Sequence, residues 1–127
     1  MEKGSTIKSF RDLRVWQIGM DLVEQVYLLT QTFHKHEVYG LASQMQRAAV
    51  SVPSNIAEGQ TREHLREYLQ HISIARASLA ELETQLEIAT RLKYCTPGQL
   101  SQFREQTDSL GRQLSTLRNA LSKNPST

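Results

Sequence analysis

The sequence predicts an all-α fold, specifically an up-down-up-down antiparallel four-helix bundle. Apolar residues recur at steps of three and four along almost the whole chain, which is the spacing of one helix face. The chain has 127 residues, 39% hydrophobic and 22% charged, as expected for a single globular domain. Short loops between the periodic segments favour antiparallel neighbours. We expect the bundle at residues 10–121, between a flexible segment at 1–9 and a frayed tail at 122–127.

The first helix is predicted to begin near Leu13 and to end near Thr30. Asp12 is the expected N-cap, because its carboxylate can accept a hydrogen bond from an N–H group of the first turn. The polar run His34–Glu37 breaks the apolar pattern and is predicted to be the first loop.

The second helix is predicted from Leu41 to Gly59, with Gly59 as a left-handed C-cap. Pro53 lies inside this segment, has no backbone N–H and crowds the preceding turn, so we expect a kink there. The alternative is that the helix stops at Val52.

The third helix is predicted to start near Thr61 and to run to about Tyr94, which makes it the longest. The fourth helix opens with a clear signal. Thr96 is the expected N-cap, Pro97 the first helical residue and Gln99 the partner in a capping box.

Two apolar arcs share the first helix. One contains Leu13, Trp16, Met20, Val23 and Tyr27; the other contains Val15, Leu22, Val26, Leu29 and Phe33. Together they span roughly 220° at 100° per residue, whereas one buried face needs about 100°. We expect the first arc to face the core, with Trp16 buried against Pro53 and Ile56. The second arc is then a candidate oligomer interface, formed by Val15, Leu22, Leu29 and Phe33. The alternative is that loops or the segment Ile7–Phe10 cover it.

The C-terminal third of the chain is basic, with six basic and two acidic residues from Arg91 onward. Arg104, Arg112 and Lys123 fall within roughly 100° of one another on the predicted fourth helix, although Asp108 interrupts them. Basic side chains in a row can neutralise nucleic-acid phosphates, so these three residues are the candidate nucleic-acid-binding strip. The alternative is an ordinary solvated helix face.

Catalytic chemistry is not predicted. The sequence lacks the Glu-x-x-His pairs typical of di-iron bundles, and the nearest set is His64, Glu67 and His71. Cys95, the single cysteine, has no nearby base in sequence that would activate it. We therefore expect no enzyme activity, no cofactor and no metal.

Four polar residues surround Pro53 in the second helix: Ser51, Ser54, Asn55 and Glu58. Their side chains can satisfy backbone groups that the proline leaves unpaired, which is a structural role. They can also form a ligand site, and the sequence does not decide between the two.

A cytoplasmic location is expected. No run approaches the roughly 18 apolar residues of a membrane span, and no apolar segment follows Met1 as in a secretory signal. A single cysteine also fits a reducing compartment.

Three segments carry a resemblance to a known family: FRDLRVWQ at 10–17, YGLASQMQRAAVSVPSNIAEG at 39–59 and ARASLAELETQLEIATRLKY at 75–94. They resemble the bacterial four-helix-bundle proteins also known as large-subunit ribosomal RNA intervening-sequence proteins. This resemblance implies a four-helix fold, a homopentameric ring and no established enzymatic activity. The family also looks related to the accessory variability proteins of diversity-generating retroelements, which assist a reverse transcriptase and bind nucleic acid.

The chain departs from the family pattern at two positions. Gln46 stands where a basic residue often follows the SQM motif, and this weakens the carry-over of nucleic-acid affinity. His34 stands where proline is common.

The resulting hypothesis is a non-enzymatic homo-oligomer, a pentamer by resemblance, that acts as a nucleic-acid-associated accessory or scaffold protein. Its expected partners are other copies of itself, RNA or DNA, and a reverse transcriptase or another protein. The alternative is a protein-binding adaptor with no nucleic-acid role.

Overall fold

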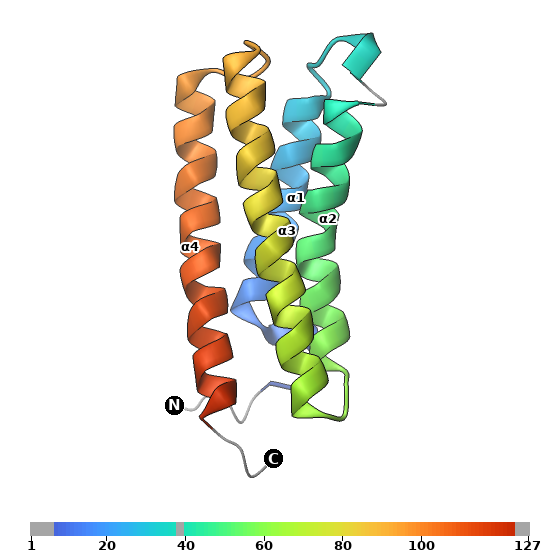
Figure 1. Cartoon of the computed structure of the whole chain (residues 1–127), viewed down its shortest axis with the longest axis vertical. Helices are drawn as coiled ribbons and strands as arrows, with labels where there is room; N and C mark the ends of the chain where they lie inside the picture. Colours follow the sequence, from blue (N-terminus) through green and yellow to red (C-terminus); the bar gives the residue numbers. More distant parts are fainter. Residues whose placement is uncertain (1–6, 38–39, 124–127) are drawn as a thin grey trace.

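Four α-helices make up most of the protein, whose computed structural model describes residues 7–37 and 40–123 (Figure 1). The elements in chain order are the 3-10 helix η2 (Phe10–Asp12), α1 (Arg14–Thr30), the 3-10 helix η3 (Lys35–Glu37), α2 (Leu41–Gln60), α3 (Leu65–Arg91) and α4 (Pro97–Ser122). No strand occurs in these described ranges, so the predicted all-α class with four helices is confirmed.

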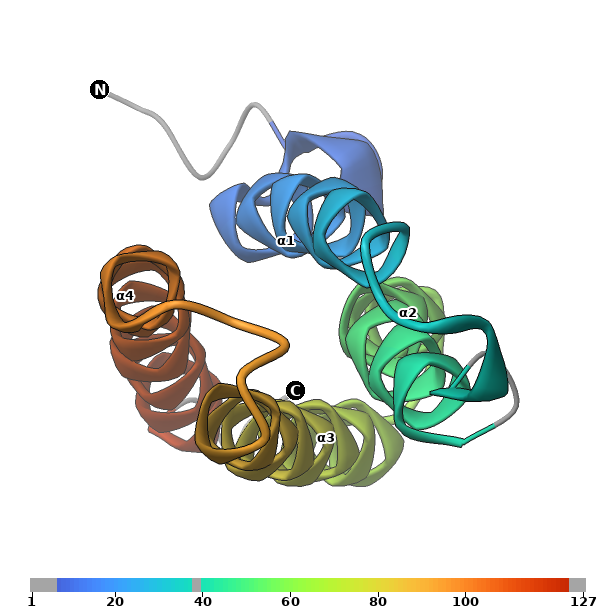
Figure 2. The same cartoon turned by 90° about the horizontal axis from the view of Figure 1, so that it is seen from above.

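The four helices lie side by side, and each contacts two neighbours. Seen from above, α1 and α3 both lie between α2 and α4 (Figure 2). In Figure 1 the chain ascends in α1, descends in α2, ascends in α3 and descends in α4. The lower end of the protein therefore holds η2, the turn between α2 and α3, and the end of α4. The upper end holds η3 and the loop between α3 and α4.

Parts of the chain ends lie outside the described residues. The predicted flexible segment 1–9 is described only from residue 7 onward, and the predicted tail 122–127 only up to residue 123. Both assignments stay predictions.

The start of α4 follows the predicted capping box. The backbone N–H of Gln99 donates to Thr96 Oγ1 at 3.1 Å, and the backbone N–H of Thr96 donates to Gln99 Oε1 at 2.9 Å. Pro97 is the first helical residue, where its missing N–H costs nothing.

The predicted N-cap of the first helix is wrong. Leu13 is the N-cap of α1 and provides no side-chain cap. Asp12 instead belongs to η2, where its Oδ2 accepts the backbone N–H groups of Lys8 at 2.8 Å and Ser9 at 3.2 Å. The carboxylate thus caps the preceding turn, because the chain makes a separate 3-10 helix before α1 starts.

Pro53 lies within a continuous α2, which extends to Gln60, so the alternative end at Val52 is wrong. The kink at Pro53 stays a prediction. Pro53 is buried, and its ring lies against α1 at Gly19, where an added Cβ would lie 3.4 Å from Pro53 Cβ. This distance is an ordinary van der Waals contact, so Gly19 and Pro53 mark where α1 packs on α2, and an alanine would also fit there.

Gly59 is not the predicted left-handed C-cap. It lies inside α2, and the glycines in the described residues have no positive φ. A Cβ at Gly59 would lie 2.8 Å from His71 Cβ, closer than real Cβ contacts. The glycine is therefore needed for the close packing of α2 against α3 rather than for a turn.

The helix α3 ends at Arg91, earlier than the predicted end at Tyr94. Lys93 has a φ of 71°, and it is the one non-glycine residue with positive φ among those described. The N–H of Tyr94 donates to the carbonyl of Ala89 at 2.8 Å, and that of Lys93 donates to Thr90 at 3.1 Å. This is the Schellman arrangement with lysine in the position that usually holds glycine.

The core takes one face from each helix, and on α1 that face is the second apolar arc. The four residues assigned to an oligomer interface are buried. Their exposed fractions are 4% for Val15, 0% for Leu22, 5% for Leu29 and 9% for Phe33. They fill the interior of the single chain, so their assignment to a subunit interface is wrong.

The first arc, predicted to be buried, faces outward. Met20 and Tyr27 are each 41% exposed, and Leu13, Trp16 and Val23 are half-buried at the edge of the core. The two arcs are equally apolar, so periodicity cannot rank them. In the structure α1 is rotated so that the second arc lies in the core and Gly19 faces Pro53 of α2.

Truncating one residue from each arc tests this assignment. Leu22→Ala should lower the free energy of unfolding by about 2–5 kcal/mol, because it leaves a cavity in the core. Met20→Ala should cost clearly less than Leu22→Ala, because Met20 is 41% exposed and its truncation leaves no enclosed cavity. Urea denaturation measured by circular dichroism gives both values, and equal costs would contradict the assignment.

Candidate functional site

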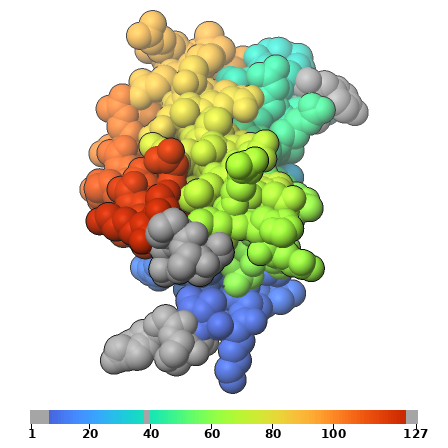
Figure 3. All heavy atoms as spheres, turned by 60° about the horizontal axis from the view of Figure 1, so that its bottom comes forward, coloured from blue at the N-terminus to red at the C-terminus, as the bar shows by residue number. Residues whose placement is uncertain are grey.

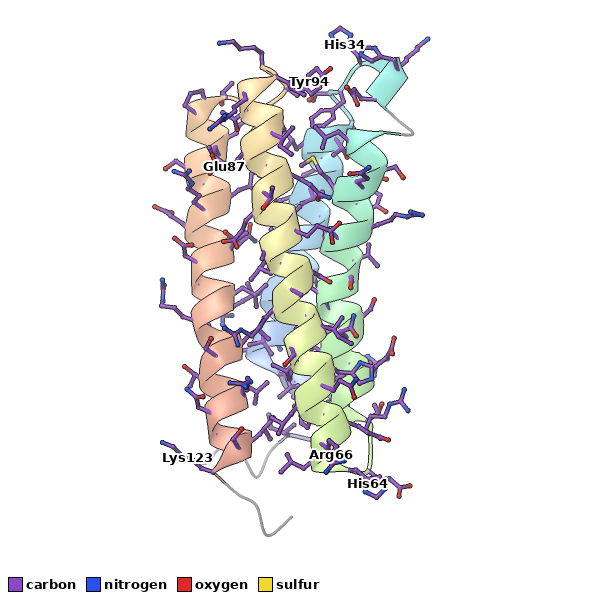
Figure 4. All side chains as sticks on the ribbon, in the orientation of Figure 1. His34, His64, Arg66, Glu87, Tyr94 and Lys123 are labelled. Atoms are coloured by element: carbon purple, nitrogen blue, oxygen red, sulfur yellow. The ribbon has the colours of Figure 1, made fainter. Side chains whose placement is uncertain are left out.

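Three segments that are distant in sequence meet at the lower end of the protein (Figure 3), and each of them carries basic residues. All seven are exposed: Lys8, Arg11 and Arg14 around η2 and the start of α1, Arg62 and Arg66 around the α2–α3 turn, and Arg118 and Lys123 at the end of α4. We call this set the basic end; Figure 4 labels Arg66 and Lys123. Four acidic residues lie at the same end: Asp12, Glu58, Glu63 and Glu67. Positive charge is therefore in excess there.

Two contacts shape the charge of the basic end near η2. The backbone N–H groups of Lys8 and Ser9 hold the pKa of Asp12 below its ordinary value, so this carboxylate is already engaged by the backbone. The guanidinium of Arg11 lies 4.6 Å from the centroid of the Phe10 ring, a cation–π contact. Phe10 in turn packs against Trp16, with ring centroids 5.4 Å apart. Arg11 is thus held in place while its side chain stays exposed.

The three residues of the predicted strip on α4 are exposed but are not brought together. Arg104 forms an ion pair with Glu87 on α3, in the upper half of the molecule. Arg112 lines a groove between α3 and α4 that also contains Asp108. Lys123 alone belongs to the basic end. From Arg104 to Lys123 the helix rises about 29 Å, so the strip is long and its upper part is partly neutralised.

Sequence reasoning missed most of the basic end. Lys8, Arg11 and Arg14 lie within seven residues of one another, and Arg62 and Arg66 flank the turn before α3. The sequence therefore contains these basic residues as short local clusters. Only the topology shows that the start of α1, the α2–α3 turn and the end of α4 meet at one end.

A groove of about 310 Å³ runs between α1 and α2 on the outside of the bundle. It is lined by Trp16, Met20, Val23, Val50, Pro53, Ser54 and Ala57. We call this surface the apolar seam. Met20 and Val50 remain 41% and 40% exposed, and Tyr27, next to the seam, is 41% exposed. A contiguous exposed apolar surface of this kind usually marks an interaction site.

The polar residues around Pro53 form a hydrogen-bond network with α3. The hydroxyls of Ser51 and Ser78 lie 2.8 Å apart. Asn55 Nδ2 donates to the backbone oxygen of Ser51 at 2.9 Å and to its Oγ at 3.0 Å. Asn55 Oδ1 lies 2.9 Å from His71 Nδ1, and Glu58 lies 3.9 Å from the same nitrogen. These contacts join α2 to α3, so they favour the structural interpretation.

The remaining member of that polar group, Ser54, is exposed and takes part in the apolar seam. The backbone carbonyl that Pro53 leaves unpaired belongs to Ala49, four residues earlier, whereas the amide of Asn55 bonds to Ser51. The network therefore links two helices rather than repairing the proline site.

The upper end is held by Glu37. Its Oε1 accepts the backbone N–H of Leu41 at 3.2 Å, and its Oε2 accepts the hydroxyl of Tyr94 at 3.0 Å. The Leu41 N–H and the Tyr94 hydroxyl hold the pKa of Glu37 below its ordinary value. The same carboxylate raises the pKa of Tyr94. Figure 4 shows Tyr94 and His34 at this end, with ring centroids 6.1 Å apart.

Metal and nucleophile candidates are weak in the part of the chain that the structure describes. There, no three His, Cys, Asp or Glu side chains are grouped so as to hold a metal ion, and this includes the set His64, Glu67 and His71. Cys95 is buried, and burial raises the pKa of its thiol, which keeps it in the less reactive protonated form. None of the helices, as far as they are described, is long and apolar enough to cross a membrane.

The fold and these surfaces define a four-helix protein with a basic end and an apolar seam. The family model described as 23S rRNA-intervening sequence protein matches residues 11–116, and the chain belongs to this family. No curated protein matches the chain.

The hydrogen bonds that Glu37 accepts from Leu41 and Tyr94 predict a specific pH dependence of stability. Because the folded pKa of Glu37 is depressed, its contribution to stability is present above the ordinary value near 4.5 and is lost as the pH falls through the folded pKa. Glu37→Gln should therefore be less stable than the parent protein at pH 7, and the difference should shrink below about pH 4. Thermal melts across this range measure it. A stability difference between the two proteins that stays constant with pH would contradict this role of Glu37.

Proposed function

We propose that this protein is a non-enzymatic, homo-oligomeric scaffold that associates with nucleic acid through its basic end. The main observation behind this proposal is that three chain segments with seven exposed basic residues meet at one end of the bundle. Membership in a family whose name refers to 23S ribosomal RNA supports a nucleic-acid-associated role.

The chemistry of the basic end suits phosphate contacts. Lysine and arginine displace counterions condensed on the nucleic-acid backbone, and this gain does not depend on base sequence. The nearby aromatic rings are partly covered: Phe10 lies between Arg11 and Trp16. We therefore expect salt-dependent and sequence-tolerant binding.

Self-association is proposed from the apolar seam. Met20, Tyr27 and Val50 lie on neighbouring turns and are each at least 40% exposed. Contact with a second protein surface would remove these apolar side chains from water, which is favourable. The subunit number five is what the family resemblance implies. Since each chain has a formal net charge of +2, five copies would carry +10, which would strengthen weak binding of a polyanion.

The alternative function is a protein-binding adaptor in which the seam receives a different protein and the basic residues only confer solubility. A reverse transcriptase is one such partner by resemblance. A cytoplasmic location and the absence of a cofactor are part of the proposal in either case.

A matched pair of charge variants tests nucleic-acid binding. The test variant carries three changes at the basic end: Arg62→Gln, Arg66→Gln and Lys123→Gln. The control carries the same charge change at the upper end: Lys35→Gln, Arg91→Gln and Lys93→Gln. Fluorescence anisotropy with a labelled RNA or DNA in about 50 mM salt should show weaker binding for the test variant. Its log–log salt slope should fall by about 2 to 3, since each lost contact contributes 0.7–0.9.

The control should bind almost as well as the parent protein. Equal losses in both variants would show a general charge effect without a site. No binding by the parent protein would leave the adaptor as the function to pursue.

Light scattering tests self-association. The parent protein should have a mass that is a multiple of 14.5 kDa at micromolar concentration. A monomer under these conditions contradicts the homo-oligomer.

A further inference from the structure

A second unpartnered surface lies on the outside of α3. It consists of small and apolar residues that are all exposed: Ile74, Ala77, Ala80, Thr84 and Ile88. Ile74 and Ile88 are each 42% exposed. We call this surface the α3 outer face. The small side chains in its centre would let another helix pair approach closely.

The apolar seam has a charge of opposite sign along each edge. Glu24 lies on the α1 edge, where it lines the groove between α1 and α4 on the side away from α2. Arg47 lies on the α2 edge, turned from Val50 toward α3 by roughly 60° at 100° per residue. Both side chains are exposed.

The α3 outer face also has opposite charges along its edges. Arg76 lies on the edge toward α4, where it lines the α3–α4 groove. Glu81 is exposed on the edge toward α2, and the amide of Gln85 donates to it at 3.4 Å. When this face is placed against the seam of another copy in the same orientation, opposite charges therefore face each other along both edges.

We propose that the apolar seam packs against the α3 outer face of a second copy that has the same orientation. In that arrangement Arg47 lies beside Glu81 of the neighbouring copy. Glu24 then lies along the same edge of the contact as Arg76 of the neighbouring copy. If the neighbour were turned end for end, like charges would meet at both edges, so the charges select one orientation. This inference rests on the proposed self-association and names its two surfaces.

The heights of one of the two charge pairs, Arg47 and Glu81, agree with side-by-side packing. The hydroxyls of Ser51 and Ser78 touch at 2.8 Å, and α2 and α3 run in opposite directions. Arg47, four residues above Ser51 on α2, is therefore at nearly the same height as Glu81, three residues above Ser78 on α3. Copies placed at equal height bring these two charges together without a shift along the bundle.

The two surfaces differ: the seam lies between α1 and α2, whereas the other surface belongs to α3, which lies on the other side of α2 from α1 (Figure 2). Such a contact is heterologous, so each copy uses its seam on one neighbour and its α3 outer face on another. A heterologous contact closes into a ring only if the rotation between successive copies divides the full circle. Pairing of two seams would instead leave Ile74 and Ile88 uncovered.

A mixing experiment distinguishes these contacts. Met20→Glu disables the seam and Ile88→Glu disables the α3 outer face, at positions of nearly equal exposure (41% and 42%). Leu28→Glu is the control, because Leu28 is 57% exposed outside both surfaces. Each of the first two variants should run as a monomer in light scattering, and the control should keep the parent mass. An equimolar mixture of the two monomers should form a species of twice the monomer mass, because one intact seam meets one intact α3 outer face.

Several outcomes would overturn the inference. If Ile88→Glu keeps the parent mass, or if the folded variants do not combine on mixing, the surfaces are assigned wrongly although self-association stands. Circular dichroism verifies that each variant is folded. A monomeric parent protein would instead remove the proposed self-association itself.

A charge exchange provides an independent test that leaves the apolar residues intact. Arg47→Glu should raise the dissociation constant by about tenfold or more, because it places like charges at one edge. Adding Glu81→Arg should restore most of the affinity, whereas adding Glu24→Arg should not. Restoration by Glu24→Arg instead would indicate that two seams pair with each other, and it would refute the proposed contact.

Discussion

The rotation of α1 about its own axis is the constraint on which the rest of this structure depends. A buried proline ring of α2 lies against a position of α1 that has no side chain. This contact marks the rotation that α1 adopts. Rotation in turn decides which apolar arc fills the core and which remains outside. The apolar seam, its edge charges and the surfaces available to partners all follow from this one packing choice.

The fold class was predictable because it depends on signals that are local in sequence. Helical periodicity defines four segments, and the pattern Thr96-Pro97-x-Gln99 marks the start of α4 within one turn. Glycine was harder to interpret. Gly59 resembles a helix end in sequence but serves close packing against His71, and the left-handed position is taken by Lys93. A glycine that is needed for close packing against another helix has no recognisable pattern of neighbouring residues in the sequence.

The surfaces were less predictable than the fold, for a related reason. On α1 both arcs are apolar, so the hydrophobic pattern had two equivalent solutions, and the structure adopts one of them. On α4 the basic residues share a helix side but are spread along its length, and Arg104 is paired with Glu87 of α3. The positive charge that does gather comes from three segments. Its position depends on which helix ends meet, and helix ends far apart in sequence meet only through the topology.

The polar network between α2 and α3 shows how one helix pair is specified beyond apolar packing. Ser51, Asn55, Ser78 and His71 satisfy one another across the contact. A slip of one turn between the helices would leave several of these partly buried groups without partners, which is costly. The network thus fixes the relative height of α2 and α3, and this height determines where Arg47 and Glu81 lie.

The positions of the chain ends have a practical consequence. The described chain begins at Ile7 and stops at Lys123, and both residues lie at the lower end (Figure 1). Any affinity tag or fluorescent protein fused directly before Ile7 or directly after Lys123 would therefore emerge beside the arginines and lysines of that end. Such an attachment would compete sterically with a bound polyanion. A probe placed in the loop around His34 and His36, at the far end of the molecule, would leave that region unobstructed.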